Sequence, residues 1–342
     1  MDLSARPADG ADDRAEQAGI FFREGVAVSS RIPVLAIVGP TAVGKTSASI
    51  ALAERIGAEV ISVDSRQVYR YLDVGTDKIS LSVRRRVIHH MIDVVDPDQV
   101  FSAADFTTGC SDAIDRILAR GRVPLLAGGT PFFFEAFFKG MLSAELPKSE
   151  EIRRELEEFA REKGADALHS LLRSVDPTSA ERLHVNDVRR VVRALEIHRL
   201  TGERVEDAWE KRVALGEPHR YDVLYLGIVK ERRLLFERID ERVREQFSSG
   251  FVEEVAWLLE NGYDERFPSM QGFGYKDIIE HLRGECSLEE AAESDARQTK
   301  AFSRRQMTWF RKFSPIIWYD TDDCTEDELI ISMEREALRH LG

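Results

Sequence analysis

Short apolar runs that end in turn residues predict a parallel sheet. Val34–Val38 is a continuous apolar run of the kind found in strands buried on both faces, and it leads through a glycine-containing loop into a predicted helix, Thr46–Ile56. Glu59–Val63 and Val123–Ala127 read as further strands, and Ile316–Tyr319 is expected to return to the sheet. Strands that alternate with helices predict an α/β fold whose sheet is covered on both faces.

The segment 146–215 differs in character from the residues around it. It is highly charged, lacks β-branched runs and is broken at Asp176-Pro177, so we expect several helices there. We therefore predict an α/β core made of residues 31–145 and 216–342, with C-terminal helices, and a helical insertion at 146–215. Residues 1–30 show no sustained apolar period and are expected to form a disordered tail.

Composition narrows the classes of protein that need to be considered. No apolar run approaches the roughly 20 residues of a membrane helix. The cysteines Cys110, Cys286 and Cys324 are far apart, which argues against a zinc site and fits a reducing cytoplasm. The net charge of −13 argues against a nucleic-acid partner, but the segment 294–313 carries six basic residues against one acid, and 189–204 is also basic. Each segment is either a phosphate-binding face or a solvated helix face.

A phosphate-binding loop follows the first predicted strand. Its sequence matches GxxxxGK[ST], in which glycines let backbone N–H groups surround phosphate oxygens and the next helix adds its positive end. The lysine supplies a charge, and the final hydroxyl is a ligand for Mg²⁺. We thus expect a P-loop NTPase-like sheet. The loop is Gly39-Pro40-Thr41-Ala42-Val43-Gly44-Lys45-Thr46.

The loop alone does not identify the phosphate compound. Nucleoside triphosphate is the usual ligand, and a small-molecule kinase is one candidate function. Such enzymes hold Mg²⁺ with an acid at the end of a neighbouring strand, whereas here Val123–Ala127 ends in Gly128-Gly129-Thr130 and Asp64 ends another strand. A non-catalytic RNA-binding protein is the other alternative, although it has no use for a complete phosphate loop.

Eight blocks in order resemble the tRNA dimethylallyltransferase (isopentenyl-tRNA transferase) family of bacterial type. Together they cover the chain from about residue 34 to 313. The blocks are GPTAVGKT at 39–46, DSRQVYRYLDVGTDK at 64–78, HHMIDVVDP at 89–97, FSAADF at 101–106, GGT at 128–130, NDVRRVVRALEIHRLTG at 186–202, GFGYKD at 272–277 and RRQMTWFRK at 304–312. The sequence departs from the family at Pro131-Phe132-Phe133, at His184-Val185-Asn186-Asp187 and at Asp77, where alanine is usual.

The resemblance implies a reaction and its partners. A dimethylallyl group moves from dimethylallyl diphosphate to N6 of adenosine 37, in tRNAs that read codons beginning with U, and diphosphate is released. The resemblance also implies Mg²⁺ held at Thr46, the tRNA anticodon stem-loop as partner, and a monomeric, cytoplasmic protein that does not bind membranes.

The resemblance also assigns roles to residues. The phosphate loop with Lys45 holds the diphosphate together with Arg242, for which Arg238 is the alternative. Asp64 takes the proton from the adenine amine, although an aspartate before Ser-Arg-Gln is also a plausible cap. Thr130 orients the amine or the base, and Gln67 binds the adenine edge.

Contacts with tRNA are implied at further positions. For Trp309 and Phe310 we favour a core position, and for His89, His90 and Asp93 a structural role, because adjacent histidines on a strand face opposite sides. The predicted tRNA-binding residues are Asp64, Ser65, Arg66, Gln67, Thr130, Arg189, Arg190, Val191, Val192, Arg193, Gln271, Gly274, Tyr275, Lys276, Arg304, Arg305, Gln306, Trp309 and Arg311.

Overall fold

A computed structural model describes residues 31–138, 146–215 and 220–342. The predicted tail, 1–30, lies outside the described residues. The chain divides into two compact units. Unit 1 comprises the residues up to Phe134 and those from Arg220 onward, and unit 2 is Glu135–His219. Each unit has its own apolar core, so each is described separately.

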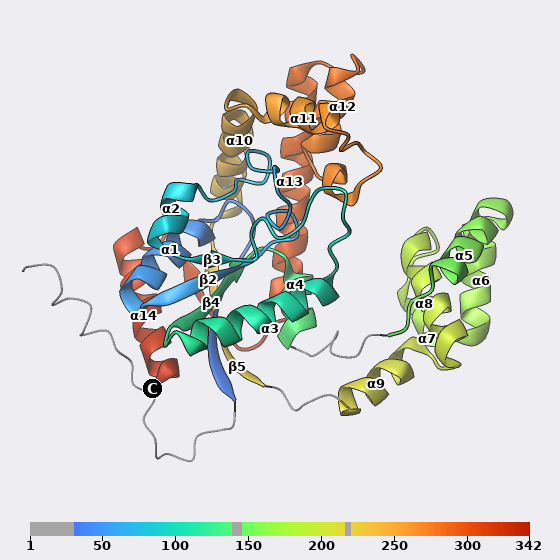
Figure 1. The fold of residues 1–342 in the computed structure, drawn as a ribbon, viewed down its shortest axis with the longest axis horizontal. Helices are drawn as coiled ribbons and strands as arrows, with labels where there is room; N and C mark the ends of the chain where they lie inside the picture. The colour runs from blue at the N-terminus through green and yellow to red at the C-terminus, as the bar shows by residue number, and fades with distance from the viewer. Residues whose placement is uncertain (1–30, 139–145, 216–219) are drawn as a thin grey trace, which may run out of the picture. The chain divides into compact units, whose positions relative to one another are not determined.

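Unit 1 is built on a six-stranded sheet in which every paired neighbour is parallel. The strand order is β3-β2-β4-β1-β5-β6, so the strand before the phosphate loop lies near the middle (Figure 1). The four predicted strands are confirmed, and the two-residue β3 and the longer β5 are strands that were not among the predicted ones. The strands are β1 (Ile32–Val38), β2 (Ala58–Val63), β3 (His89–His90), β4 (Val123–Gly128), β5 (Tyr221–Val229) and β6 (Ile316–Asp320).

The central strands carry apolar residues on both faces of the sheet, and helices pack against these faces. Leu35 and Ile37 of β1 pack in one cluster with α1 (Lys45–Ile56) and α14 (Glu326–Leu341). The alternate residues of β1 point to the opposite face. α3 (Ala103–Ala119) packs on β2 and β4 and begins with a capping box between Ser102 and Asp105. The short helices α2 (Leu81–Arg86) and α4 (Pro131–Phe138) complete this part of the chain.

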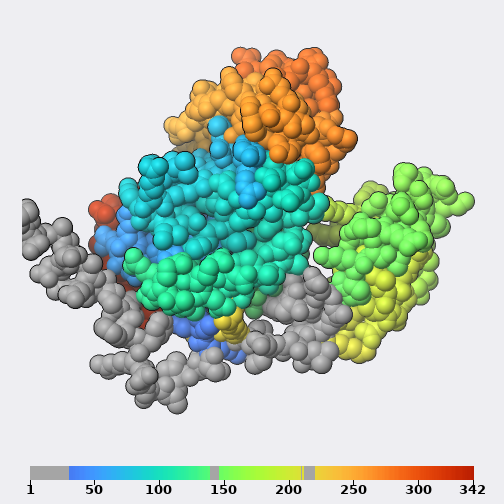
Figure 2. Space-filling model, viewed as in Figure 1, coloured from blue at the N-terminus to red at the C-terminus, as the bar shows by residue number. Residues whose placement is uncertain are grey.

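A second cluster joins segments that are far apart in the sequence. Val68, Tyr69 and Leu72 follow β2 and pack against Phe251 and Tyr275. In the space-filling view the orange surface of the later segment lies against the cyan surface of the earlier one (Figure 2). These later elements are α10 (Arg232–Ser248), α11 (Phe251–Glu260), the 3-10 turn η2 (Pro268–Gln271), α12 (Tyr275–Leu282) and α13 (Leu288–Phe310).

Unit 2 consists of helices in its described part. Glu196 of α8 is fully buried and accepts hydrogen bonds from Arg153, Arg193 and the backbone N–H of Ser149, so its charge is compensated. Asp176 caps α7, whose first residue is a proline. The helices are α5 (Glu150–Lys163), α6 (Ala165–Val175), α7 (Pro177–Arg182), α8 (Val188–Thr201) and α9 (Val205–Leu215). In neither unit does a described helix combine the length and the apolar character that crossing a membrane requires.

Candidate functional site

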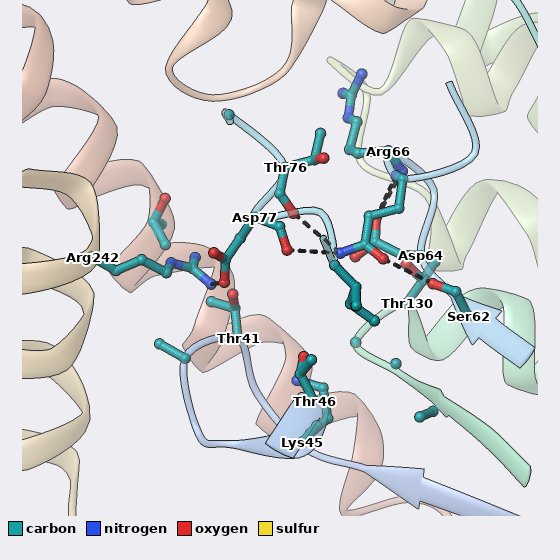
Figure 3. Close-up of a pocket in the computed structure, with 18 of the residues that line it drawn as sticks. Thr41, Lys45, Thr46, Ser62, Asp64, Arg66, Thr76, Asp77, Thr130 and Arg242 are labelled. Carbon is teal, nitrogen blue, oxygen red and sulfur yellow. Dashed lines mark hydrogen bonds and ion pairs between the residues drawn. The ribbon is translucent and has the colours of Figure 1, made fainter. Parts of the chain in front are cut away.

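A cavity of about 850 Å³ opens at the carboxyl ends of β1, β2 and β4. Ligands bind at this edge of a parallel sheet because the loops after neighbouring strands converge there. The phosphate loop, the segment after β2, the Gly128–Thr130 turn after β4 and side chains of α10 and α13 line it. All lining residues belong to unit 1. Figure 3 shows labelled side chains around this space, among them Arg242, Asp77 and Asp64, whereas the side chain of Arg66 points away from the others.

The phosphate loop has the backbone that its glycines predict. Gly39 has a φ of 153°, and a Cβ atom there would lie 2.5 Å from the carbonyl oxygen of Ile228, so only glycine fits. Gly44 has a φ of 102° and precedes α1. The first N–H groups of a helix lack partners within the helix, so the N-terminus of α1 can bind an anion. The loop therefore forms an anion-binding cradle at the floor of the cavity.

Lys45 lies deep in this cradle. Its Nζ donates a hydrogen bond to the carbonyl oxygen of Pro40 at 2.6 Å. Burial, together with the positive charge of Arg242, lowers the pKa of the Lys45 ammonium from 10.5 to about 7, although the nearby carboxylate of Asp64 acts in the opposite direction. An anion bound in the cradle replaces the missing solvation and restores the charged form. Thr46, the next residue, is exposed at the cavity.

Two arginines of α10 face the cradle. Arg242 Nη1 lies 3.8 Å from Oδ2 of Asp77, and its buried Nε has no hydrogen-bond partner among the described residues. Arg238 is one turn earlier, and a Cβ atom built on Gly44 would lie 4.0 Å from its Nη1. Both side chains line the cavity, so the structure brings both predicted diphosphate contacts to the phosphate loop.

Asp64 follows β2 and lines the same cavity as Lys45. Its Oδ1 accepts hydrogen bonds from the backbone N–H groups of Arg66 at 2.7 Å and Gln67 at 3.3 Å. Asp64 therefore acts as a cap, as the alternative prediction expected, but it caps a turn and not a helix. Oδ2 has no hydrogen-bond partner in the described part of the chain, so one oxygen fixes the carboxylate while the other is available to a ligand.

Gln67 and Thr130 hold the loops around Asp64. Gln67 Oε1 accepts from the hydroxyl of Ser62 at 3.1 Å, and its Nε2 donates to the carbonyl oxygen of Thr76 at 3.2 Å. Thr130 Oγ1 accepts from the backbone N–H of Ser65 at 3.3 Å. The amide of Gln67 is thus engaged within the protein, and its predicted contact with adenine requires exchange of these bonds.

Gln306 and Tyr275 are buried, which changes the role that we predicted for them. Gln306 accepts from the backbone N–H of Thr41 and donates to the carbonyl oxygen of Gly129, so it joins the loops after β1 and β4. The Tyr275 hydroxyl donates to Glu254 at 2.7 Å. Both line the cavity wall, but their side chains support its loops instead of presenting a surface to RNA.

Several other predicted contacts in unit 1 are exposed. Arg304, Arg305 and Arg311 lie on the outer side or at the end of α13. Gln271 and Lys276 are also exposed, whereas Gly274 is buried at the start of α12. Arg66 donates to the carbonyl oxygens of Pro268 and Ser269, which ties the turn η2 to the loop after β2.

The two aromatic residues at the end of α13 differ in burial. Phe310 is fully buried, which confirms the core position favoured for it. Trp309 is partly exposed, and its ring lies 6.2 Å from that of Phe132, measured between centroids.

The predicted contacts in unit 2 divide into two sets. Arg189 and Arg190 are exposed on α8. Val191 and Val192 are buried in the core of unit 2, so their side chains cannot contact RNA, and this part of the prediction is corrected. Arg193 donates to the carbonyl oxygens of Leu146 and Pro147 and to Glu196, which is a structural role. The signal for burial was the helical spacing of Val188, Val191, Val192 and Leu195, which places the two valines on the apolar side of α8.

The histidine pair after α2 has no metal-binding geometry. His90 Nε2 lies 2.7 Å from Glu59 Oε2, and Asp93 pairs with Lys78 and Arg84. His89 bonds the carbonyl oxygen of Val87 through Nδ1 and lines the cavity. Within the described ranges no group of three or more His, Cys, Asp or Glu side chains is placed to hold a metal ion. The contacts of His90 with Glu59 and of Asp93 with Lys78 and Arg84 fit the structural role favoured for these residues.

The sequence analysis missed two acids that shape the site. Glu254 of α11 accepts from the backbone N–H groups of Asp73, Val74 and Gly75, so it clamps the loop that reaches Asp77. Asp295 of α13 is buried on the cavity wall, and burial raises its pKa to about 6. Both lie on later helices, and no local pattern distinguishes them from surface acids.

Comparison with known proteins gives a consistent result. Residues 67–313 match the family model described as IPP transferase. The tRNA dimethylallyltransferase of Lachnoclostridium phytofermentans is 41% identical over 300 residues, which cover 88% of this chain and 95% of that protein. The tRNA dimethylallyltransferase of Thermomicrobium roseum is 46% identical over 293 residues, covering 86% of this chain and 88% of that protein.

Solved structures with the same fold are also similar. The tRNA isopentenylpyrophosphate transferase of Bacillus halodurans shares 37% identity with a TM-score of 0.68, covering 92% of this chain and 97% of that one. A eukaryotic dimethylallyltransferase acting on tRNA shares 28% identity with a TM-score of 0.75, covering 89% of this chain and 79% of that one. The similarity therefore extends over both units of the chain.

Proposed function

The chain belongs to the IPP transferase family, and from this premise we propose that it transfers a dimethylallyl group from dimethylallyl diphosphate to tRNA. The acceptor is N6 of adenosine 37 in tRNAs that read codons beginning with U, and the products are N6-(dimethylallyl)adenosine and diphosphate. One observation carries the proposal. A phosphate-binding cradle and the carboxylate of Asp64, which has one available oxygen, line the same cavity.

The cradle suits diphosphate as a leaving group. Backbone N–H groups of the phosphate loop, Lys45 and Arg242 supply positive charge where the oxygen of the departing diphosphate gains negative charge. The allylic carbon–oxygen bond breaks with its electron pair on diphosphate. The same groups stabilise ADP in a kinase, so the cradle alone does not exclude that function.

Asp64 supplies the second part of the chemistry. As the nitrogen–carbon bond forms, the exocyclic amine of adenine becomes positively charged and loses a proton, which the Asp64 carboxylate accepts. The two backbone N–H groups at Oδ1 fix the orientation of this carboxylate. A general base of this kind contributes about 10²–10⁴ in rate.

The residues at the cradle fit Mg²⁺. Thr46 is exposed at the cavity and offers a hydroxyl oxygen next to the anion-binding backbone. Mg²⁺ typically takes few protein ligands and completes its shell with phosphate oxygens and water, so the absence of a cluster of three acids among the described residues is compatible with it. When bound, Mg²⁺ neutralises charge on the leaving diphosphate.

Recognition of tRNA uses the exposed basic residues. Adenine has to leave its stack to reach Asp64, as in other enzymes that modify bases. Arg304, Arg305 and Arg311 of α13 and Arg189 and Arg190 of α8 are proposed to bind the phosphates of the anticodon stem-loop. The substrate implies action in the cytoplasm, and we propose that the protein acts as a monomer.

The decisive experiment is a transfer assay. The protein is incubated with labelled dimethylallyl diphosphate, Mg²⁺ and unmodified tRNA, and the label on RNA is expected to depend on adenosine 37. A tRNA with guanosine at this position is the matched control. Turnover of ATP without RNA, together with no label on tRNA, would favour a kinase instead.

A further inference from the structure

The cavity contains an acid that the proposed reaction does not use. Asp77 lies on the loop after β2 and directs its carboxylate toward Arg242, across the phosphate loop from Lys45 and Thr46 (Figure 3). Oδ2 of Asp77 lies 3.8 Å from Nη1 of Arg242. The Asp77 side chain is 62% exposed and that of Arg242 is 24% exposed. The acid is thus the more exposed member of the pair.

The loop around Asp77 is held on both sides. Gln67 donates to the carbonyl oxygens of Thr76 and Asp77, and the backbone N–H of Asp77 donates to Val74. The side chain of Lys78 is buried and bonded to Asp73 and Asp93. Since these contacts fix the backbone, including a positive φ of 53° at Asp77, the carboxylate stays near Arg242.

In this arrangement the guanidinium of Arg242 has N–H groups that can still bind an anion. Its buried Nε has no partner in the described part of the chain, and the contact with Asp77 is a single long ion pair. A bidentate anion such as diphosphate satisfies a guanidinium better than this pair does. A partly exposed ion pair is weak, so an anion can displace it.

We propose that Asp77 is an internal counter-ion that competes with the diphosphate for Arg242 and thereby sets the affinity for the prenyl donor. The proposal rests on the diphosphate site of the proposed function. When the donor binds, Arg242 leaves Asp77 and turns to diphosphate oxygens. Asp77 then lies beside a highly negative ligand, which weakens binding of the donor and eases release of the product.

A role of Asp77 as a magnesium ligand is the main alternative. The geometry favours the counter-ion, because the carboxylate faces the guanidinium of Arg242 and not Thr46. The two roles predict opposite effects when the charge is removed. Loss of a counter-ion strengthens diphosphate binding, whereas loss of a metal ligand weakens it when Mg²⁺ is present.

The test is calorimetric titration of the full chain with inorganic diphosphate, with and without Mg²⁺. Asp77→Asn keeps the shape of the side chain and suits a positive φ. We expect its Kd to fall by about tenfold in both conditions at low salt, and by less at high salt. Glu241→Gln is the matched control, since Glu241 is an exposed acid on the cavity wall with no ion pair to another described residue. We expect it to change the Kd less than threefold.

A double variant identifies the route of the effect. In the Arg242→Ala background, the gain from Asp77→Asn should shrink to less than half, because the competition requires Arg242. An undiminished gain, no gain beyond that of Glu241→Gln, or weaker binding only with Mg²⁺ would each overturn the proposal. This titration does not need prenyl transfer, so its result is separate from failure of the transfer assay.

Discussion

The backbone N–H of Thr41 donates a hydrogen bond of 2.9 Å to Oε1 of Gln306, a residue 265 positions later. Nε2 of Gln306 donates to the carbonyl oxygen of Gly129. One buried side chain therefore satisfies a group on the loop after β1 and another on the loop after β4.

Gln306→Ala should leave both backbone groups without a partner. We expect the free energy of unfolding to fall by about 2–4 kcal/mol, since each unsatisfied buried group costs about 1–3 kcal/mol. Prenyl transfer should slow by at least about tenfold as the phosphate loop loses its support. Urea unfolding and steady-state kinetics measure the two effects, with Glu289→Ala, at an exposed position of α13, as control. An unchanged urea midpoint and an unchanged rate of prenyl transfer would show that the two loops keep their structure without Gln306.

Lys45 makes diphosphate binding depend on pH. Its pKa of about 7 in the free protein means that the ammonium is lost as pH rises through 7, while a bound diphosphate restores it. We expect the affinity for inorganic diphosphate to fall by up to about tenfold per pH unit above 7, with proton uptake on binding. Calorimetry in buffers of different ionisation enthalpy measures this uptake. Lys45→Arg is the control, since arginine stays charged; equal uptake by both proteins would assign the proton elsewhere.

The same group makes stability depend on pH. The lowered pKa means that between pH 7 and 10.5 the unfolded chain carries a proton on Lys45 that the folded protein lacks. The free energy of unfolding gains a positive slope with pH in this window from Lys45. In Lys45→Met this contribution should disappear, and the variant should be more stable at pH 6 and inactive. Urea unfolding across the window tests the difference, and parallel curves for the two proteins would contradict it.

Asp64→Asn separates catalysis from capping. The amide oxygen can still accept the hydrogen bonds from Arg66 and Gln67, but the side chain no longer accepts a proton. We expect transfer to slow by at least about a hundredfold, while tRNA affinity and unfolding free energy change little. Asp222→Asn, at the start of β5, is the matched control. A transfer rate within tenfold of that of the unmodified protein would show that Asp64 only caps the turn and is not the general base.

The exposed arginines of α13 should set the salt dependence of tRNA binding. We expect the double variant Arg304→Ala, Arg305→Ala to bind tRNA more weakly and to lower the slope of log K against log salt by about 2, one for each phosphate contact. Filter binding over a range of salt measures the slope. Arg339→Ala on α14, which is exposed and pairs with Glu336, is the control. An unaltered slope would remove this face from the interface.

The sequence predicted the elements whose signals are local. The apolar runs at Val34–Val38 and Val123–Ala127 and the glycines of the phosphate loop determine their structures through nearby chemistry, and the structure confirms them. β5 was missed although Val223–Val229 is an apolar run of the same kind, so its signal is also local. Its partners β1 and β6 are distant in the sequence.

The site was predicted less completely than the fold. Asp64, Lys45 and Arg242, which the motifs singled out, all line one cavity. The motifs did not distinguish residues that face RNA from those that support the site, so Tyr275 and Val191 were assigned to a surface that they do not reach. Burial of this kind depends on packing between distant helices, as with Tyr275 and Glu254.

Arg305 and Gln306 are consecutive residues on one rigid helix, with the first exposed and the second buried between two loops. A rotation of α13 that moves the arginine outward also pulls on the amide nitrogen of Thr41 and the carbonyl of Gly129. Movement of the outer surface of α13 is therefore coupled to movement of the loops that form the floor of the pocket.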